Sequence, residues 1–199
     1  ISKLWRYCGY GTYEYWVDAS GKVRAPRDGY KERRVNGERD RHFVVATPQE
    51  GWRLEQRRDQ FVPGWCAPYS KLLKSTCYLI ADQFRKQHTP GYYELYHQFK
   101  EEERKAHPEP LCRECGVPRS ECKVRGHHVI YNPGHLDHRA MRKVTKVFLQ
   151  HLWIVWRTLD GLPVSRPYVH DVLGHGTYYA PADFGWPVVL AEEENVAAE

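Results

Sequence analysis

Residues 111–128 read Leu111-Cys-Arg-Glu-Cys-Gly-Val-Pro-Arg-Ser-Glu-Cys-Lys-Val-Arg-Gly-His-His128, and they include three of the six cysteines of the chain. Two residues separate Cys112 from Cys115, and the glycine that follows favours a tight turn in which both thiolates reach one metal ion. A third cysteine and a histidine five or six positions later would complete a tetrahedral Cys3His set. The stretch therefore predicts a zinc ion held by Cys112, Cys115, Cys122 and His127.

Three other histidines are alternatives for the fourth ligand of this predicted site, namely His128, His135 and His138. Four protein ligands leave no open position on the metal, so we expect a structural Zn²⁺ cofactor whose binding energy contributes to folding. A redox Cys-x-x-Cys pair and free buried thiols are the competing interpretations. The nearby third cysteine and the absence of a strand-to-helix junction argue against the redox pair, and the polar, charged surroundings argue against free buried thiols.

The first part of the chain has the alternating pattern of β structure. Residues 12–17 alternate, a turn follows at 18–21, and residues 22–24 return, which predicts a hairpin. Residues 25–40 are polar and rich in Arg and Gly, so we expect a long loop or an exposed extension before a short strand at 42–46. Prolines at 63 and 68 mark the predicted end of a β-rich region, 1–68.

Beyond this boundary the apolar period changes to about 3.6 residues, which is typical of helices. We expect helices at 71–87 and 92–105, with Ser70 capping the first. A third helix begins near Asp137 and ends before Gly161; its apolar stripe is Met141, Val144, Phe148, Leu152, Val155 and Leu159. The predicted fold is α+β, an N-terminal antiparallel β region followed by a helical region (69–199) with an inserted zinc knuckle in loop 111–128 and an irregular C-terminal segment at 162–199.

No stretch approaches the roughly 18 to 20 consecutive apolar residues of a membrane helix, because Lys146, Gln150 and His151 interrupt the richest one. We therefore expect a soluble protein with no membrane partner. Clustered cysteines beside histidines favour a reducing compartment, so the predicted location is intracellular, either cytoplasmic or nucleoid-associated. The chain begins at Ile1 without a leader pattern, which suggests a trimmed chain or part of a longer one.

Basic residues are concentrated around the zinc motif. Residues 111–146 contain eight Lys or Arg against three Asp or Glu, and this local excess of five equals the formal net charge of +5 of the whole chain. The predicted nucleic-acid contacts are Arg125, Arg139, Arg142, Lys143 and Lys146. A solvated helix face is the alternative. We expect a zinc-stabilised module that binds DNA or RNA, as part of a larger nucleic-acid-processing assembly with other protein subunits.

Histidines near the C-terminus form a second group. His170 and His175 are five residues apart, so they do not share a helix face and would need a loop to converge on a metal. A pairing of His170 with Asp171 or a nearby carbonyl is favoured over a second metal or catalytic site.

The segment with Cys112, Cys115, His128, Asn132 and His138 resembles in part the HNH (His-Me finger) nucleases. This resemblance implies a base histidine at His128, an orienting asparagine at Asn132 and a cation-binding histidine at His138. A metal-dependent nuclease is therefore an alternative function. A protein-interaction scaffold is a third, with the aromatic segment around Tyr178, Tyr179, Phe184 and Trp186 as its surface.

Overall fold

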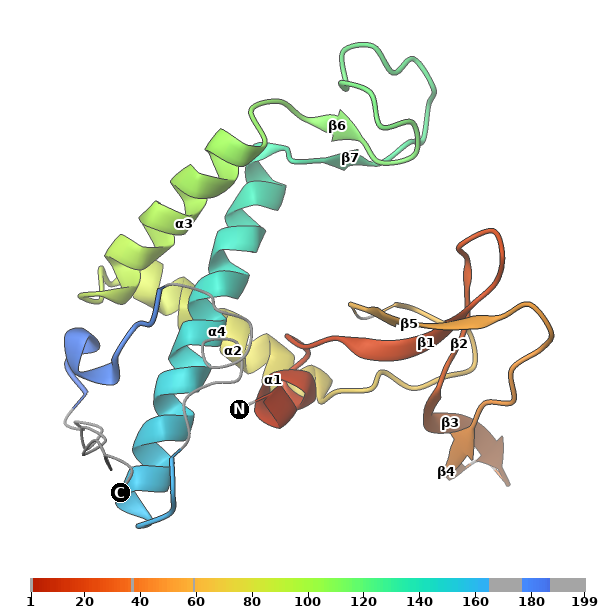
Figure 1. Ribbon diagram of the computed structural model, residues 1–199, viewed down its shortest axis with the longest axis horizontal. Helices are drawn as coiled ribbons and strands as arrows, with labels where there is room; N and C mark the ends of the chain where they lie inside the picture. Colours follow the sequence, from red (N-terminus) through yellow and green to blue (C-terminus); the bar gives the residue numbers. More distant parts are fainter. Residues whose placement is uncertain (1, 37, 59, 165–176, 187–199) are drawn as a thin grey trace, which may run out of the picture. The chain divides into compact units, whose positions relative to one another are not determined.

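The computed structural model describes residues 2–36, 38–58, 60–164 and 177–186, and the chain divides into two compact units, Ile1–Cys77 and Tyr78–Glu199. After a short helix, α1 (Ser2–Tyr7), the first unit consists of antiparallel strands, and helices dominate the second (Figure 1). The predicted α+β class is therefore confirmed. His170, His175 and the acidic tail at 192–199 lie outside the described residues.

An antiparallel sheet in the first unit has the strand order β2-β1-β5, formed by β1 (Tyr13–Val17), β2 (Val23–Pro26) and β5 (Arg53–Arg57). The carboxylate of Asp18 closes the β1–β2 hairpin, because it accepts hydrogen bonds from the backbone N–H groups of Ser20 and Lys22 at 2.9 and 3.0 Å. Alternate residues of β1 are buried, as the period of two predicts. The predicted hairpin is confirmed.

The long loop expected at residues 25–40 is wrong. These residues contain β3 (Asp28–Val35), which pairs along its whole length with β4 (Glu38–Val45) in a two-stranded ribbon. Cross-strand contacts stabilise it: Nε of Arg41 donates to Glu32 at 3.1 Å, and the rings of Tyr30 and Phe43 meet edge to face at 5.5 Å. Both rings are exposed, and the opposite face of β4, with Asp40, His42 and Val44, is only half-buried and mixes polar with apolar residues, so the sequence carries no clear apolar alternation there.

The two predicted helices after residue 70 are confirmed within one residue at each end, as α2 (Lys71–Lys86) and α3 (Tyr92–Ala106). Oγ of Ser70 accepts a hydrogen bond from the backbone N–H of Leu73 at 3.3 Å, which is the predicted cap. Cys77 on α2 is buried as a small apolar residue. The boundary between the two compact units falls after Cys77, within α2.

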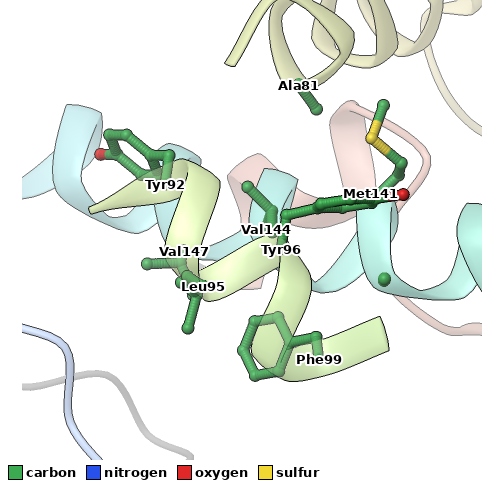
Figure 2. Packing of buried hydrophobic residues seen from close by; sticks show 9 residues of the cluster. Ala81, Tyr92, Leu95, Tyr96, Phe99, Met141, Val144 and Val147 are labelled. Atoms are coloured by element: carbon green, nitrogen blue, oxygen red, sulfur yellow. The ribbon is translucent and has the colours of Figure 1, made fainter. Parts of the chain in front are cut away.

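The core of the second unit lies between α3 and the long helix α4 (Pro133–Leu159) (Figure 2). The two helices are antiparallel, because Tyr92 at the start of α3 contacts His151 late in α4, whereas Glu103 near the end of α3 pairs with Arg139 early in α4. The buried cluster contains Ala81, Tyr92, Leu95, Tyr96, Phe99, Ala140, Met141, Val144 and Val147. Packing of these side chains holds the end of α3 beside the start of α4.

The predicted end of the third helix is confirmed, because α4 ends at Leu159 and Gly161 follows with a φ of +66°, whereas its predicted start needs correction. The helix begins at Pro133, and the side chain of Asn132 caps it by accepting from the backbone N–H of His135 at 2.8 Å. Asp137 lies inside the helix and accepts a hydrogen bond from Nζ of Lys100 at 2.7 Å. At the other end Leu159 is 76 % exposed rather than core, because it lies eight residues, or about 12 Å, past His151 and so beyond the start of α3.

Although α4 is 27 residues long, no helix within the described parts of the chain combines the length and the apolar composition that crossing a bilayer requires.

Residues 177–186 belong to the second unit, pack against its core and include the short 3-10 helix η1 (Pro181–Phe184). Phe184 and Tyr179 pack against the core cluster, and Nε1 of Trp186 donates to the hydroxyl of Tyr92 at 2.8 Å. Tyr179, Phe184 and Trp186, which were considered for an interaction surface, therefore pack within the chain.

Candidate metal centre

A short hairpin joins α3 to α4 and carries the cysteine-rich loop. Its strands are β6 (Leu111–Cys112) and β7 (Val129–Ile130), which pair antiparallel, with Cys112 opposite Val129 (Figure 1, green). The backbone N–H of Arg113 also donates to the carbonyl of His128 at 2.9 Å. The hairpin thus brings the two ends of the loop together, and with them the first and last predicted ligands.

The four predicted ligand residues lie together. The ligand atoms of Cys112, Cys115, Cys122 and His127 are all within 4.8 Å of one another. Nδ1 of His127 is 3.4, 3.2 and 3.6 Å from the sulfur atoms of Cys112, Cys115 and Cys122, in that order. The sulfurs of Cys115 and Cys122 are 4.0 Å apart. This arrangement is compatible with one metal ion at the centre of the four atoms.

The turn between the first two cysteines has the hydrogen bonds that its spacing requires. The backbone N–H of Cys115 points to the sulfur of Cys112 at 3.4 Å, and that of Gly116 donates to the carbonyl of Cys112 at 2.9 Å. Gly116 has a φ of +74°, a conformation that a residue with a Cβ rarely adopts. The glycine after the second cysteine therefore has the backbone role that the sequence predicts.

The electrostatics of the cluster favour a cation. Hydrogen bonding to Cys112, together with burial and the second neighbouring sulfur of Cys122, raises the pKa of Cys115 to about 11. A backbone N–H at Val124 lowers the pKa of Cys122. Three sulfurs this close repel one another as thiolates, so a divalent cation between them is what would let all three ionise.

Glu114, which the sequence did not single out, lies beside the cluster and holds the neighbouring histidine. Its carboxylate accepts from the backbone N–H of His128 at 2.9 Å and lies 2.8 Å from Nδ1 of the same residue. The hydrogen bond from His128 lowers the pKa of Glu114 to about 2. His128 is thereby paired outside the cluster, which leaves His127 as the histidine that faces the three sulfurs.

The other two candidate ligands also have partners elsewhere. Nδ1 of His135 accepts from the backbone N–H of Tyr131 at 2.9 Å, and Nε2 of His138 is 3.4 Å from the hydroxyl of Tyr78. Asn132 caps α4, and His128 pairs with Glu114. The three residues of the nuclease-like motif, His128, Asn132 and His138, therefore each contact a different partner. Among the described residues, the Cys3His set is the one group of three or more potential ligands close enough to share an ion.

Two of the predicted nucleic-acid contacts on α4 lie against α3. Arg139 donates through Nε to the buried carboxylate of Glu103, and its guanidinium lies 5.5 Å from the ring centre of Tyr131. Nζ of Lys143 is 2.9 Å from the same carboxylate and 3.6 Å from that of Glu102. Arg142 and Lys146 also have interactions of their own. The adjacent residues Glu102 and Glu103 on α3 were the signal in the sequence that cations of α4 would form ion pairs with the preceding helix.

The cations of the loop are placed differently from those of the helix. Arg119 donates to the carbonyl of Cys122 at 3.0 Å and so supports the cluster. Arg113, Lys123 and Arg125 are exposed, and among the described residues their side chains have no hydrogen-bond or ion-pair partner. Among the predicted contacts, Arg125 is therefore exposed to solvent with no side-chain partner in the part of the chain that the structure describes.

No protein-family model, no curated protein and no solved structure matches this chain.

Proposed function

We propose that the Cys3His cluster binds one Zn²⁺ as a closed structural site, and that the loop folded around it contacts the phosphates of a nucleic acid. A tetrahedral zinc ion with Zn–S near 2.3 Å and Zn–N near 2.0 Å puts neighbouring sulfurs about 3.8 Å apart and sulfur and nitrogen about 3.5 Å apart. The distances of 4.0 Å and of 3.2 to 3.6 Å in the cluster support this geometry. Soft thiolates with one imidazole also favour zinc over harder cations.

The nucleic-acid part of the proposal is supported by three exposed cations of the loop, whose side chains have no partner within the described ranges of the chain. Arg113, Lys123 and Arg125 lie within thirteen positions of one another on a segment whose shape the metal would fix. Lysine and arginine that neutralise phosphates release counterions, which supplies affinity without sequence preference. The helix cations Arg139 and Lys143 contribute to the positive potential but are shared with Glu103.

The test combines metal analysis with a binding titration. Purified protein is expected to contain one zinc per chain, and a labelled oligonucleotide is expected to bind with an affinity that falls as salt rises. Replacing Arg113, Lys123 and Arg125 with Gln removes three phosphate contacts and should reduce the slope of log K against log salt by roughly 2 to 3.

The matched control replaces three exposed cations of the first unit, Lys3, Lys22 and Arg58, with Gln. It removes the same formal charge and should leave most of the slope in place. Equal losses in the two triple variants would mean that net charge alone drives binding, and the loop would have no specific part in it.

A further inference from the structure

A hollow of about 350 Å³ lies where α2 turns into α3, at the other end of α3 from the cysteine-rich loop. Its cations are Arg85, Lys86 and Lys100, and its rings are those of His88, Tyr93, Tyr96 and His97. Among the described residues no aspartate or glutamate lines it. A surface of this composition favours a ligand that has both a negative charge and a flat ring.

The rings form a continuous series from solvent to the core. The ring of His88 is stacked on Tyr93 with centres 4.3 Å apart and planes at 22°. His97 meets Tyr93 at 4.5 Å and Tyr96 at 5.0 Å, both edge to face. Both histidines are exposed and Tyr96 is buried, so the outer rings are supported from below by a fixed one. Supported, exposed rings are suited to stacking with a base.

The cations are held in place by carboxylates that lie outside the lining. Asp82 pairs with Arg85 and Lys86, both at 2.6 Å, and Asp137 pairs with Lys100 at 2.7 Å. Three cations thus share two carboxylates, which leaves one positive charge for a ligand. This excess suits a single phosphate beside the rings rather than a run of phosphates.

The larger hollow of the first unit, about 770 Å³, differs in that a carboxylate is part of its lining. Its lining includes Glu32, which lies 3.1 Å from Nε of Arg41 and 3.7 Å from Nε of Arg39. This lining also has a net positive charge, from Arg39, Arg41 and Lys71, but both of its arginines are shared with a carboxylate inside the lining, whereas the carboxylates that pair with the cations of the smaller hollow lie outside its lining.

We propose that the hollow at the α2–α3 turn binds single-stranded nucleic acid, with a base stacked on the rings of His88, Tyr93 and His97 and its phosphate beside Lys86 and Arg85. This inference rests on the proposed function and specifies the form of nucleic acid. A base inside a duplex is already stacked on both sides, so the site selects unpaired nucleotides. Both DNA and RNA single strands present the same base and phosphate chemistry.

The experiment compares fluorescence anisotropy of a labelled 12-nucleotide dT strand, the same length of U, and a 12-base-pair duplex, with metal-loaded protein. Tyr93→Leu removes a stacking ring and should weaken single-strand binding roughly 5- to 150-fold, with a smaller effect on the duplex. Tyr93→Phe keeps the ring and should bind like the wild type. His97→Ala, at an exposed position, repeats the test in case Tyr93→Leu fails to fold.

Controls separate the stacking contact from charge and from the loop. Tyr7→Leu removes an exposed ring from the first unit and should leave binding unchanged. Inorganic tripolyphosphate at equal phosphate concentration should compete poorly, and strong competition would overturn the stacking contact. Full single-strand affinity in both Tyr93→Leu and His97→Ala, or a preference for duplex, would overturn the inference while the loop proposal stands. Absence of binding by all three oligonucleotides would overturn both.

Discussion

The hydroxyl of Tyr92 lies 2.7 Å from Nδ1 of His151, and the same oxygen accepts a hydrogen bond of 2.8 Å from Nε1 of Trp186. The indole N–H can only donate, so the tyrosine uses its own proton for His151. Nε2 of His151 donates in turn to the carbonyl of Tyr179 at 2.9 Å. This network fixes a neutral imidazole and ties residues 177–186 to α3 and α4.

Replacing Tyr92 with Phe is expected to destabilise the second unit by about 1 to 3 kcal/mol, because it leaves the buried Nδ1 of His151 and the partly buried Nε1 of Trp186 without their partner. Urea denaturation followed by far-UV circular dichroism measures the change. Tyr93→Phe is the matched control, since it removes a hydroxyl from a half-buried residue of the same helix. A Tyr92→Phe variant as stable as Tyr93→Phe would show that the network adds little.

Stability should also depend on pH through His151. Burial lowers the pKa of this imidazole below its usual value of about 6.5, although its hydrogen bond to Tyr179 acts in the opposite direction. The unfolded chain therefore takes up a proton near pH 6.5 that the folded chain refuses, so the free energy of unfolding decreases as the pH falls below about 6.5. Above about pH 7 this contribution is fully present.

Denaturation midpoints between pH 5.5 and 7.5 test this dependence, with His151→Gln as the comparison. The pKa of His135 is also lowered, but that residue remains in both proteins and its effect cancels in the difference. The wild-type profile should be the steeper of the two. Parallel profiles would contradict a role for His151.

Glu103 is expected to be the main polar contact between α3 and α4. Burial opposes its charge, yet hydrogen bonds from Arg139 and Lys143 lower the pKa of its carboxyl. Glu103→Gln removes the carboxylate that Arg139 pairs with and leaves Lys143 only the longer contact with Glu102, so we expect a loss of about 1 to 3 kcal/mol in the free energy of unfolding. Glu102→Gln, at a side chain that is 48 % exposed, should change it by less than about 0.5 kcal/mol.

Local patterns were enough to predict much of the fold and the metal cluster. The spacing of Cys112, Cys115, Cys122 and His127 fixed which atoms meet, because the ligands lie within sixteen residues and depend on one turn and one short hairpin. Helices α2 and α3 were predictable from the period of their apolar residues, and members of both helices pack in one core cluster with residues of α4.

Features that depend on contacts between distant residues were missed. The β3–β4 ribbon is held by cross-strand pairs such as Glu32 with Arg41, which a search for buried alternation does not detect. Arg139 and Lys143 pair with Glu103, which lies some forty residues earlier in the chain. The pairs form because α3 and α4 lie antiparallel, and a local pattern does not predict this contact. The α2–α3 hollow likewise combines residues of two helices, and its histidines had no motif to identify them.

Removal of the metal should unfold the loop and spare the helices. The core cluster of α3 and α4 contains no residue of the loop, whereas the hydrogen bonds within 112–128 depend on a turn that the proposed zinc closes. Treatment with a chelator, or Cys115→Ser, should therefore preserve the far-UV helical signal while amide exchange at Cys112, Arg113 and Gly116 becomes faster. Cys66→Ser, outside the cluster, should retain one zinc per chain and normal exchange. Loss of the helical signal together with the metal would instead mean that the second unit folds only around the ion.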